Sequence, residues 1–307
     1  MNSPVRIGVD VGGTNLRVGV ARGHQILWEH RHEADFSRIC RENAAPRALE
    51  KITAELAAII GSARRQYPAA ESVGIGFPGF IDPTSGIVSL SPNLPGLANV
   101  DITRPLAREL GIPVRIENDA LCAAYGEYLL ASPRPESLIY LGLGTGIGGG
   151  LILNGKPYPG QHGVAMEVGH IIVRPDGRPC GCGNRGCLER YASASGVAVS
   201  YHELSLVERD AESIAELAAQ GDSHAVEAFR YAAETLAAAL AHILKVLDVE
   251  TIVIGGGMCA AWPLLQSRFD DCLDRALIPA LRGRTRVVLS KAGDQAGMLG
   301  AAALAGD

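Results

Sequence analysis

Long apolar runs and an excess of positive charge are both lacking in this chain, and each lack excludes a class of function. No run of apolar residues is long enough to span a bilayer. With a formal net charge of −5, the chain offers no electrostatic reason to bind nucleic acid. The N-terminal segment MNSPVRIGVD passes directly into a strand-like pattern, without a signal-peptide region. We therefore expect a cytoplasmic protein that binds neither nucleic acid nor a membrane.

Cysteines are few and odd in number, which argues against a framework of disulfides. Three of the seven lie close together between Cys180 and Cys187. This distribution is typical of free thiols plus a metal site in a reducing compartment. Glycine, in contrast, is abundant at 37 of 307 residues, and its clustering suggests backbone that approaches a ligand.

The cysteine cluster predicts a structural metal site. His170, Cys180, Cys182 and Cys187 form a Cys3His set, which suits tetrahedral zinc and leaves no position for a catalytic water. The loop between them is rich in Gly, Pro, Asn and Arg, so a metal would supply the order that apolar packing cannot. The alternative is three reduced thiols in a glycine-rich loop. Two glutamates, Glu167 and Glu189, flank the set, which suggests a loop built to present carboxylates to a ligand.

Two glycine-rich hairpins are predicted about 130 residues apart. Strands at 5–11 and 16–21 flank Gly12-Gly13-Thr14-Asn15, and residues 138–153 repeat the arrangement around Gly144-Thr145-Gly146. Backbone N–H groups and threonine hydroxyls at such turns are suited to bind phosphates. Hairpins without a ligand are the simplest alternative.

Two other phosphate-binding motifs fit less well. Residues 144–149 match the G-x-G-x-x-G dinucleotide pattern, but a strand follows where that motif requires a helix. Residues 150–156 approach a P-loop, but Pro157 replaces the hydroxyl residue that binds magnesium. We therefore favour the hairpin interpretation.

Carboxylates stand at two of the predicted strand ends. Asp10 closes the first strand and is placed to position Mg²⁺, although Asp is also common in simple turns. Asp119, with Asn118, stands between a strand at 114–117 and a helix at 120–130. Asp119 is either a helix N-cap or a base that accepts a proton from a substrate hydroxyl during phosphoryl transfer.

Further elements are predicted along the chain. A buried strand at 71–81 contains Pro78-Gly79, where glycine permits close backbone approach, and a loop at 88–97 carries Asn93. In the C-terminal half we expect helices at 222–247, 262–277 and 293–305, and strands at 251–257 and 285–289. The last helix is made of small residues, which indicates tight packing against a neighbour.

Taken together, these residues resemble the ROK family of sugar kinases, which have the actin-like ATPase (ribonuclease H-like) fold. The resemblance covers almost the whole chain, and its motifs are DVGGTN at 10–15, GFPGFID at 76–82, SPNLPG at 91–96, ENDA at 117–120, LGTGIGGGLILNG at 143–155, EVGH at 167–170, CGCGNRGCLE at 180–189, GGG at 255–257 and GDQAGMLGAA at 293–302. It implies two α/β domains around a central cleft. The smaller would comprise residues 1–118 plus 293–307, and the larger residues 119–292.

The resemblance also implies a role for each matching residue. Asp119 would be the general base toward the sugar hydroxyl, usually O6. The residues expected to bind or line the sugar site are Gly79, Asn93, Asn118, Asp119, Glu167, His170 and Glu189. Those expected to bind ATP and Mg²⁺ are Asp10, Gly12, Gly13, Thr14, Asn15, Thr145, Gly146, Gly256 and Gly257. His170 would serve both zinc and sugar, and a homodimer is expected.

Three positions depart from the family pattern, and the substrate stays open among several sugars. Many relatives have Gly where this chain has Met166, often Lys at Asn15, and frequently Asn at Leu121. PNLPG at 92–96 is similar to glucokinases, so glucose is the first expectation. N-acetylmannosamine, N-acetylglucosamine and allose are alternatives. Transcriptional repressors are a second class of function in the family, but they carry an N-terminal helix-turn-helix domain, for which a strand predicted at residue 5 leaves no room. A noncatalytic sugar sensor is the third class of function.

Overall fold

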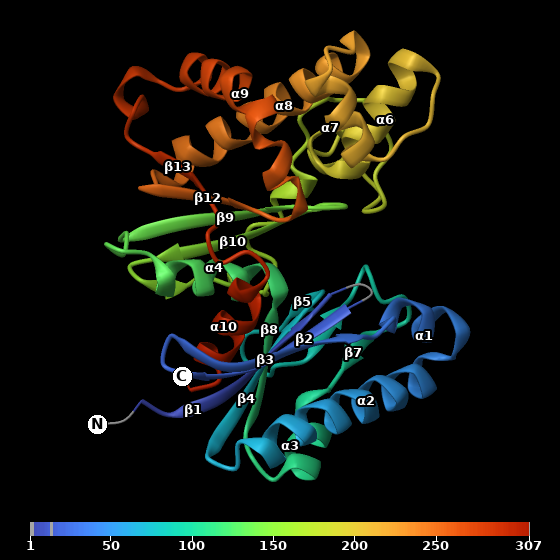
Figure 1. The fold of residues 1–307 in the computed structure, drawn as a ribbon, viewed down its shortest axis with the longest axis vertical. Helices are drawn as coiled ribbons and strands as arrows, with labels where there is room; N and C mark the ends of the chain where they lie inside the picture. The colour runs from blue at the N-terminus through green and yellow to red at the C-terminus, as the bar shows by residue number, and fades with distance from the viewer. Residues whose placement is uncertain (1–2, 13–14, 307) are drawn as a thin grey trace. The chain divides into compact units, whose positions relative to one another are not determined.

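The computed structural model describes residues 3–12 and 15–306 as a mixed α/β chain (Figure 1). Packing divides it into two compact units, and the strands form two five-stranded sheets and one three-stranded sheet among the described residues. The first unit comprises residues 1–136, 150–165 and 292–307, and the second comprises residues 137–149 and 166–291. The mixed α/β architecture agrees with the predicted fold class.

The first unit is a sheet with strand order β3-β2-β1-β4-β8 and helices on both faces. Its elements are β1 (Val5–Val11), β2 (Asn15–Arg22), β3 (Gln25–Glu33), α1 (Phe36–Glu42), α2 (Ala45–Gln66), β4 (Ala70–Phe77), β5 (Phe80–Ile81), β6 (Val88–Leu90), β7 (Ala98–Val100), α3 (Thr103–Leu110), β8 (Val114–Asn118), α4 (Asp119–Leu130), β11 (Lys156–Pro157) and α10 (Gln295–Leu304). β1 pairs antiparallel with β2 and parallel with β4, so the first predicted hairpin is confirmed.

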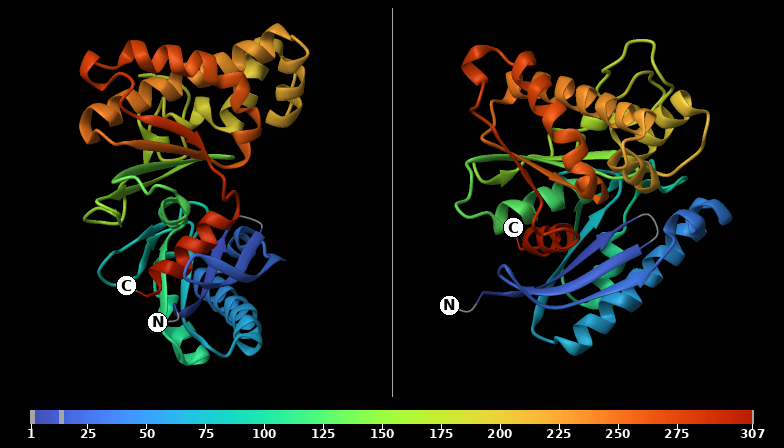
Figure 2. Two further views of the ribbon diagram at one scale, coloured as in Figure 1. Left: turned by 60° about the vertical axis from the view of Figure 1, so that its left-hand side comes forward. Right: turned by 45° about the horizontal axis from the view of Figure 1, so that its top comes forward.

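Helices α2 and α10 lie on opposite faces of this sheet (Figures 1 and 2). Successive residues of a strand point to opposite faces. Ile7 and Val9 are fully buried in the core shared with α2. Gly8 faces α10 instead, and a Cβ on Gly8 would lie 2.0 Å from the Met298 carbonyl oxygen. At Gly74 the corresponding contact, to the Ala301 carbonyl oxygen, would be 1.8 Å. Glycine therefore lets α10 pack directly on the sheet, as its small residues predicted.

Helix α4 lies with the first unit, whereas the sequence-based boundary at residues 118–119 assigned it to the second domain. The reason is its close packing against α10: a Cβ on Gly126 would lie 2.0 Å from the Ala296 carbonyl oxygen. A domain boundary placed at the end of β8 thus overlooks the contact between α4 and α10, which are far apart in the chain.

The second unit carries its helices beside a sheet with strand order β11-β10-β9-β12-β13, of which β11 and part of β10 belong to the first unit. Its elements are β9 (Ser137–Leu143), β10 (Ile147–Leu153), η1 (Val168–His170), α5 (Glu189–Ala192), α6 (Ala194–Ser205), α7 (Ala211–Ala219), α8 (Ser223–Leu247), β12 (Thr251–Gly255), η2 (Gly257–Ala261), α9 (Trp262–Ala276), η3 (Pro279–Leu281) and β13 (Arg286–Leu289). The η elements are short 3-10 helices. β12 pairs in parallel with β9 and β13, and α8 packs against α9 and α6.

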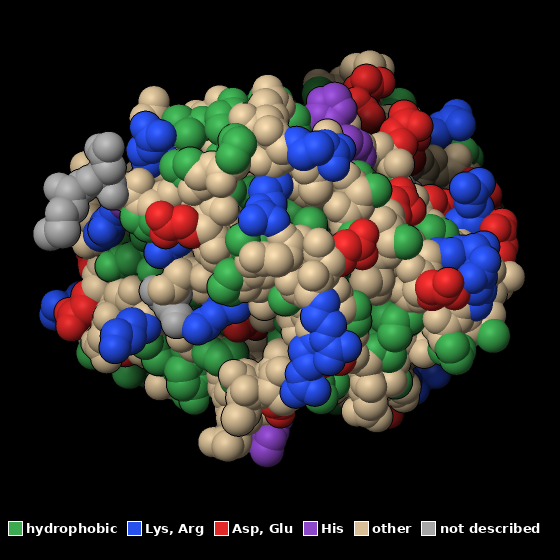
Figure 3. Space-filling model, turned by 90° about the horizontal axis from the view of Figure 1, so that it is seen from below, with side chains coloured by type: hydrophobic (Ala, Val, Ile, Leu, Met, Phe, Trp, Pro, Cys, Tyr) green, Lys and Arg blue, Asp and Glu red, His purple; other side chains and the backbone are tan. Residues whose placement is uncertain are grey.

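The described residues include no helix long and apolar enough to cross a bilayer. On the face drawn in Figure 3, basic and acidic side chains are interspersed rather than segregated by sign.

Candidate active site and metal centre

The four predicted metal ligands come together in the second unit. The ligand atoms of His170, Cys180, Cys182 and Cys187 all lie within 4.8 Å of one another. The Cys180 Sγ to His170 Nδ1 distance and the Cys182 Sγ to Cys187 Sγ distance are both 3.6 Å. Tetrahedral zinc, with bonds of about 2.3 Å to sulfur and 2.0–2.1 Å to nitrogen, requires ligand separations of about 3.5–3.8 Å. The donor set and its spacing therefore fit zinc.

The two ring nitrogens of His170 face different partners. Nδ1 faces Cys180, whereas Nε2 lies 3.7 Å from Oε2 of Glu167. Glu189 Oε1 lies 3.8 Å from Nδ1 and accepts a hydrogen bond from the Cys180 thiol at 3.1 Å. The pKa of Glu167 is raised, chiefly by burial. The two predicted carboxylates and the imidazole thus form one cluster whose geometry depends on the cysteine loop.

A strained backbone residue precedes this cluster. Met166 adopts a left-handed conformation with φ of 66°, and its carbonyl oxygen accepts a hydrogen bond from the Val168 N–H at 2.7 Å. This bond closes a tight turn around Glu167. Glycine adopts such a φ without a Cβ penalty, so the backbone here favours the glycine that the family resemblance leads us to expect at this position.

Arg178 anchors the cysteine loop, a role that the sequence analysis did not find. Its guanidinium donates to the carbonyl oxygens of Arg190 and Gly196 at 2.6 and 3.2 Å, and to Ser200 Oγ at 3.0 Å. It also forms two bonds to the Glu203 carboxylate, at 3.1 and 2.6 Å. Arginine is common on protein surfaces, so only these distant partners distinguish it.

In the first unit, Asn118 rather than Asp119 caps helix α4. Asn118 Oδ1 accepts from the Leu121 N–H at 3.0 Å, and its Nδ2 donates to the Gly79 carbonyl at 3.1 Å. Asp119 is the first helical residue, and its Oδ1 accepts from the Ala120 N–H at 2.8 Å. The alternative that Asp119 is the N-cap is therefore wrong. Asn118 holds the helix end and the Gly79 turn together, and Asp119 is the residue that follows it.

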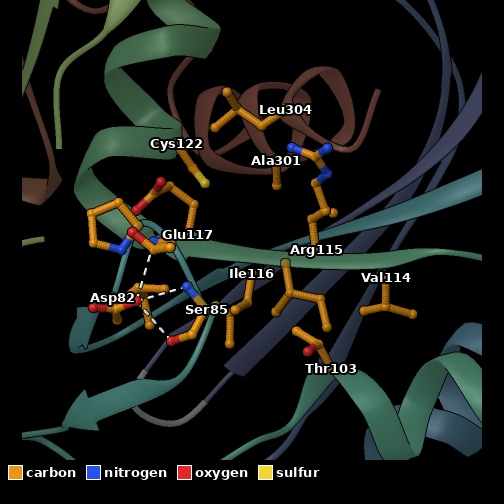
Figure 4. A pocket seen from close by; sticks show the side chains of 16 residues that line it. Asp82, Ser85, Thr103, Val114, Arg115, Ile116, Glu117, Cys122, Ala301 and Leu304 are labelled. Carbon is orange, nitrogen blue, oxygen red and sulfur yellow. Dashed lines mark hydrogen bonds between the residues drawn. The ribbon is translucent and has the colours of Figure 1, made fainter. Parts of the chain in front are cut away.

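Glu117 supports the same junction from the preceding strand (Figure 4). Its Oε1 accepts a hydrogen bond from the Asn118 N–H at 2.8 Å. Burial raises the pKa of Glu117. The side chain lines a cavity of about 370 Å³ together with residues of the 81–86 turn and α10.

Asp10 lies in the same unit, at the end of β1. Burial, and after it the nearby Asp119 carboxylate, together raise the pKa of Asp10 to about 7, while Arg17 opposes the shift. A divalent cation would relieve this repulsion, since hard cations prefer carboxylate oxygens. The residues present therefore fit Mg²⁺ beside Asp10.

Gly79 precedes β5, and Asn93 lies between β6 and β7, the three strands of a small antiparallel sheet. Gly79 has φ of 151°, and a Cβ there would lie 2.7 Å from the Leu90 carbonyl oxygen. The predicted close backbone approach is thus to the chain's own β6. Asn93 is exposed in the turn that follows β6.

The two predicted phosphate turns are described to different extents. In the first, the Gly12 N–H donates to the Asn15 carbonyl at 2.9 Å, and Asn15 Oδ1 accepts from Arg31 at 3.2 Å. Gly13 and Thr14 lie outside the described residues. In the second, the Gly144 N–H donates to the Gly146 carbonyl at 3.0 Å, across Thr145.

The second phosphate turn contacts the carboxylate cluster of its own unit. A Cβ on Gly146 would lie 3.0 Å from Glu189 Oε2. Gly256, with φ of 83°, follows β12, and a Cβ on it would lie 2.4 Å from the Leu143 carbonyl oxygen. A Cβ on Gly257 would meet no described atom within 4 Å. In the second unit, therefore, the expected adenosine turn packs directly beside strand β9, which leads into the phosphate turn.

Comparison with known proteins identifies relatives across nearly the full chain. The model of the ROK family matches residues 6–307. The glucokinase of Thermotoga maritima is 35% identical, covering 97% of this chain and 96% of the relative. The N-acetyl-D-glucosamine kinase of Pasteurella multocida is 33% identical, with 98% and 99% covered. The crystal structure of a ROK family glucokinase from Streptomyces griseus, in complex with glucose and AMPPNP, is 33% identical with a TM-score of 0.79, over 98% of this chain and 99% of that one.

Proposed function

The chain belongs to the ROK family and is a sugar kinase, and on that premise we propose that it transfers the γ-phosphoryl group of ATP to the 6-hydroxyl of glucose. The similarity to the Thermotoga maritima glucokinase and the PNLPG segment at 92–96 carry the choice of glucose. The similarity to the Pasteurella multocida enzyme favours N-acetylglucosamine as the second candidate, and N-acetylmannosamine is a further alternative.

Asp119 is the proposed general base. A carboxylate accepts the proton of the attacking hydroxyl as the bond to phosphorus forms, and its position must be held to within a fraction of an ångström. The Asn118 cap and its bond to Gly79 support this assignment, because they fix the backbone on both sides of the carboxylate. Asn118, Gly79 and Asn93 would line the sugar site in the first unit.

Glu167, His170 and Glu189 are proposed to bind sugar hydroxyls. Their support is the cluster around the cysteine loop, in which His170 Nε2 faces away from the thiols. Zinc bound by His170 and the three cysteines would hold this loop and orient the imidazole, with no role as a Lewis acid.

Phosphate and magnesium binding are proposed for the two glycine turns and Asp10. Their support is the position of both turns at strand ends and the burial of the Asp10 carboxyl. The residues concerned are Asp10, Gly12, Gly13, Thr14, Asn15, Thr145 and Gly146, with Gly256 and Gly257 near adenosine.

The test is ADP release with Mg-ATP against glucose, mannose, allose, N-acetylglucosamine and N-acetylmannosamine. We expect the highest kcat/KM with glucose, and a product phosphorylated at the 6-position. Asp119→Asn keeps the shape of the side chain, so it should retain sugar binding while turnover falls by about 10²–10⁴-fold. A kcat of Asp119→Asn near that of the wild type would refute the assignment of the base, and preference for an N-acetylated sugar would refute the choice of glucose.

A further inference from the structure

Three ring side chains form a row on the edge strand of the first unit. β3 is the last strand of the order β3-β2-β1-β4-β8. Trp28, His30 and His32 alternate along it, so all three project to one face. Their cross-strand partners on β2 are Val20, Val18 and Leu16, which are fully buried in the core. The row therefore lies on the outer border of the face that packs against α2, where His30 is exposed and His32 half-buried.

The two imidazole rings lie close together. Their ring centroids are 4.5 Å apart, with an interplanar angle of 70°. Metal–nitrogen bonds of about 2.0–2.1 Å place each ring centre about 3.2 Å from an ion, so rings at adjacent corners of a square plane are about 4.5 Å apart. Tetrahedral coordination would require a wider separation of about 5.2 Å. The observed spacing is therefore compatible with the cis positions of the tetragonal geometry that Ni²⁺ and Cu²⁺ prefer.

The ring nitrogens of this pair are available as ligands. Within residues 3–12 and 15–306, neither the His30 side chain nor the His32 side chain forms a hydrogen bond or an ion pair. His24, in contrast, has Nε2 at 2.7 Å from a guanidinium nitrogen of Arg134. Burial, and then His30, lowers the pKa of His32, which favours the neutral form that binds metals.

We propose that His30 and His32 form a second, surface metal site, which chelates a divalent transition ion of tetragonal preference such as Ni²⁺ or Cu²⁺. Because His30 and His32 project from the same face of β3, rotation of the two side chains can bring one nitrogen of each to cis positions on one ion, and water would complete the coordination. The site is separate from the Cys3His cluster, which lies in the second unit, and does not depend on the kinase assignment.

Trp28 provides a built-in reporter for this site. Its ring stacks on His30 with centroids 6.1 Å apart and an interplanar angle of 15°. A paramagnetic ion bound to His30 would quench the Trp28 fluorescence. Trp262, the other tryptophan of the chain, is buried in the second unit and supplies a constant background.

The experiment is a titration of zinc-loaded protein with NiCl2, followed by calorimetry and by tryptophan fluorescence, with zinc content measured before and after. We expect saturable binding of about one Ni²⁺ per chain with quenching, and no response to Mg²⁺, which prefers oxygen ligands. His30→Gln or His32→Gln should weaken binding by about 100-fold, because each removes one arm of the chelate. Trp28→Phe should remove the quenching and keep the heat of binding.

His24→Gln is the matched control and should bind Ni²⁺ like the wild type. Equal Ni²⁺ affinity in the wild type and in the His30→Gln/His32→Gln double variant would overturn the proposal, as would the lack of any heat in the wild type. Displacement of zinc in proportion to the Ni²⁺ added would also overturn it, since the ion would then occupy the cysteine cluster. Basal kinase activity should be the same in all these variants.

Discussion

Replacing Arg178 with alanine should loosen the loop that carries the proposed zinc ligands. The guanidinium is 12% exposed and joins the segment before Cys180 to helices α5 and α6. Pro179 continues this segment into a β-bridge with Arg185, so the anchor lies at the base of the loop. Without it, the loop is tied to the helices by fewer bonds on the Cys180 side.

The magnitude follows from the partners that are lost. The bonds to the Arg190 and Gly196 carbonyls and to Ser200 Oγ contribute about 1 kcal/mol each. The ring of Tyr191, with its centroid 4.6 Å from the guanidinium carbon, adds about 0.5–1 kcal/mol. Glu203 is 55% exposed, so its ion pair adds no more than about 1 kcal/mol. Arg178→Ala should therefore cost about 3–5 kcal/mol.

Denaturant unfolding of the zinc-loaded protein measures this cost. Arg174→Ala is the matched control, because it removes the same charge from the same loop. Arg174 is exposed and packs on Tyr231, with its guanidinium carbon 4.9 Å from the ring centroid. We expect a cost of about 0.5–1 kcal/mol for this control.

Function gives a second readout for the same pair of variants. Because Arg178 bonds to α5, which begins at Glu189, Arg178→Ala should raise the KM for sugar more than it lowers kcat. Arg178→Lys should restore only part of this loss, since lysine cannot form the two-pronged contact with Glu203. Equal free energies of unfolding for Arg178→Ala and Arg174→Ala would refute the reasoning.

Three further changes test other parts of the structure. Met166→Gly should stabilise the protein by about 0.5–1 kcal/mol and Met166→Val should destabilise it by about 1–2 kcal/mol, because the residue is left-handed; equal melting temperatures would contradict this. Burial raises the pKa of Glu117, so its ionisation lowers the stability of the wild type as the pH rises through that pKa. The melting temperature of Glu117→Gln relative to the wild type should therefore increase between about pH 4 and pH 8. A constant difference in melting temperature would contradict this expectation. Elemental analysis should find about one zinc per wild-type chain; Cys182→Ser should lose this zinc, whereas Cys272→Ser, at a half-buried thiol outside the cluster, should retain it.

Local patterns in the sequence predicted several elements well. The strand pattern on either side of Gly12 corresponds to β1 and β2, and the small residues at 293–305 correspond to α10. Such features depend on neighbours in the chain, so a pattern of a few residues suffices. The 22-residue helix α2, which packs its apolar stripe on the first sheet, went unrecognised although its apolar spacing was available.

The N-cap of helix α4 depends on a contact that the local sequence does not reveal. Asn and Asp are both good N-caps, and they stand side by side at the start of α4. Asn118 takes the role because its backbone is still extended, with φ of −58° and ψ of 138°, and because Gly79 accepts its second bond. The Gly79 carbonyl lies 39 residues before Asn118, so the local pattern around the helix start does not contain the partner that selects the cap.

By itself, the sequence determined the ROK family membership, the Cys3His set and the two glycine hairpins. These features are defined by residue types at short spacings, and such spacings can be read from the sequence without knowledge of the fold. Only the tertiary structure decided the placement of α4, the capping role of Asn118 and the anchor at Arg178. Each of these depends on bonds between segments far apart in the chain, such as Arg178 with Glu203, and their partners are set by packing rather than by local preference.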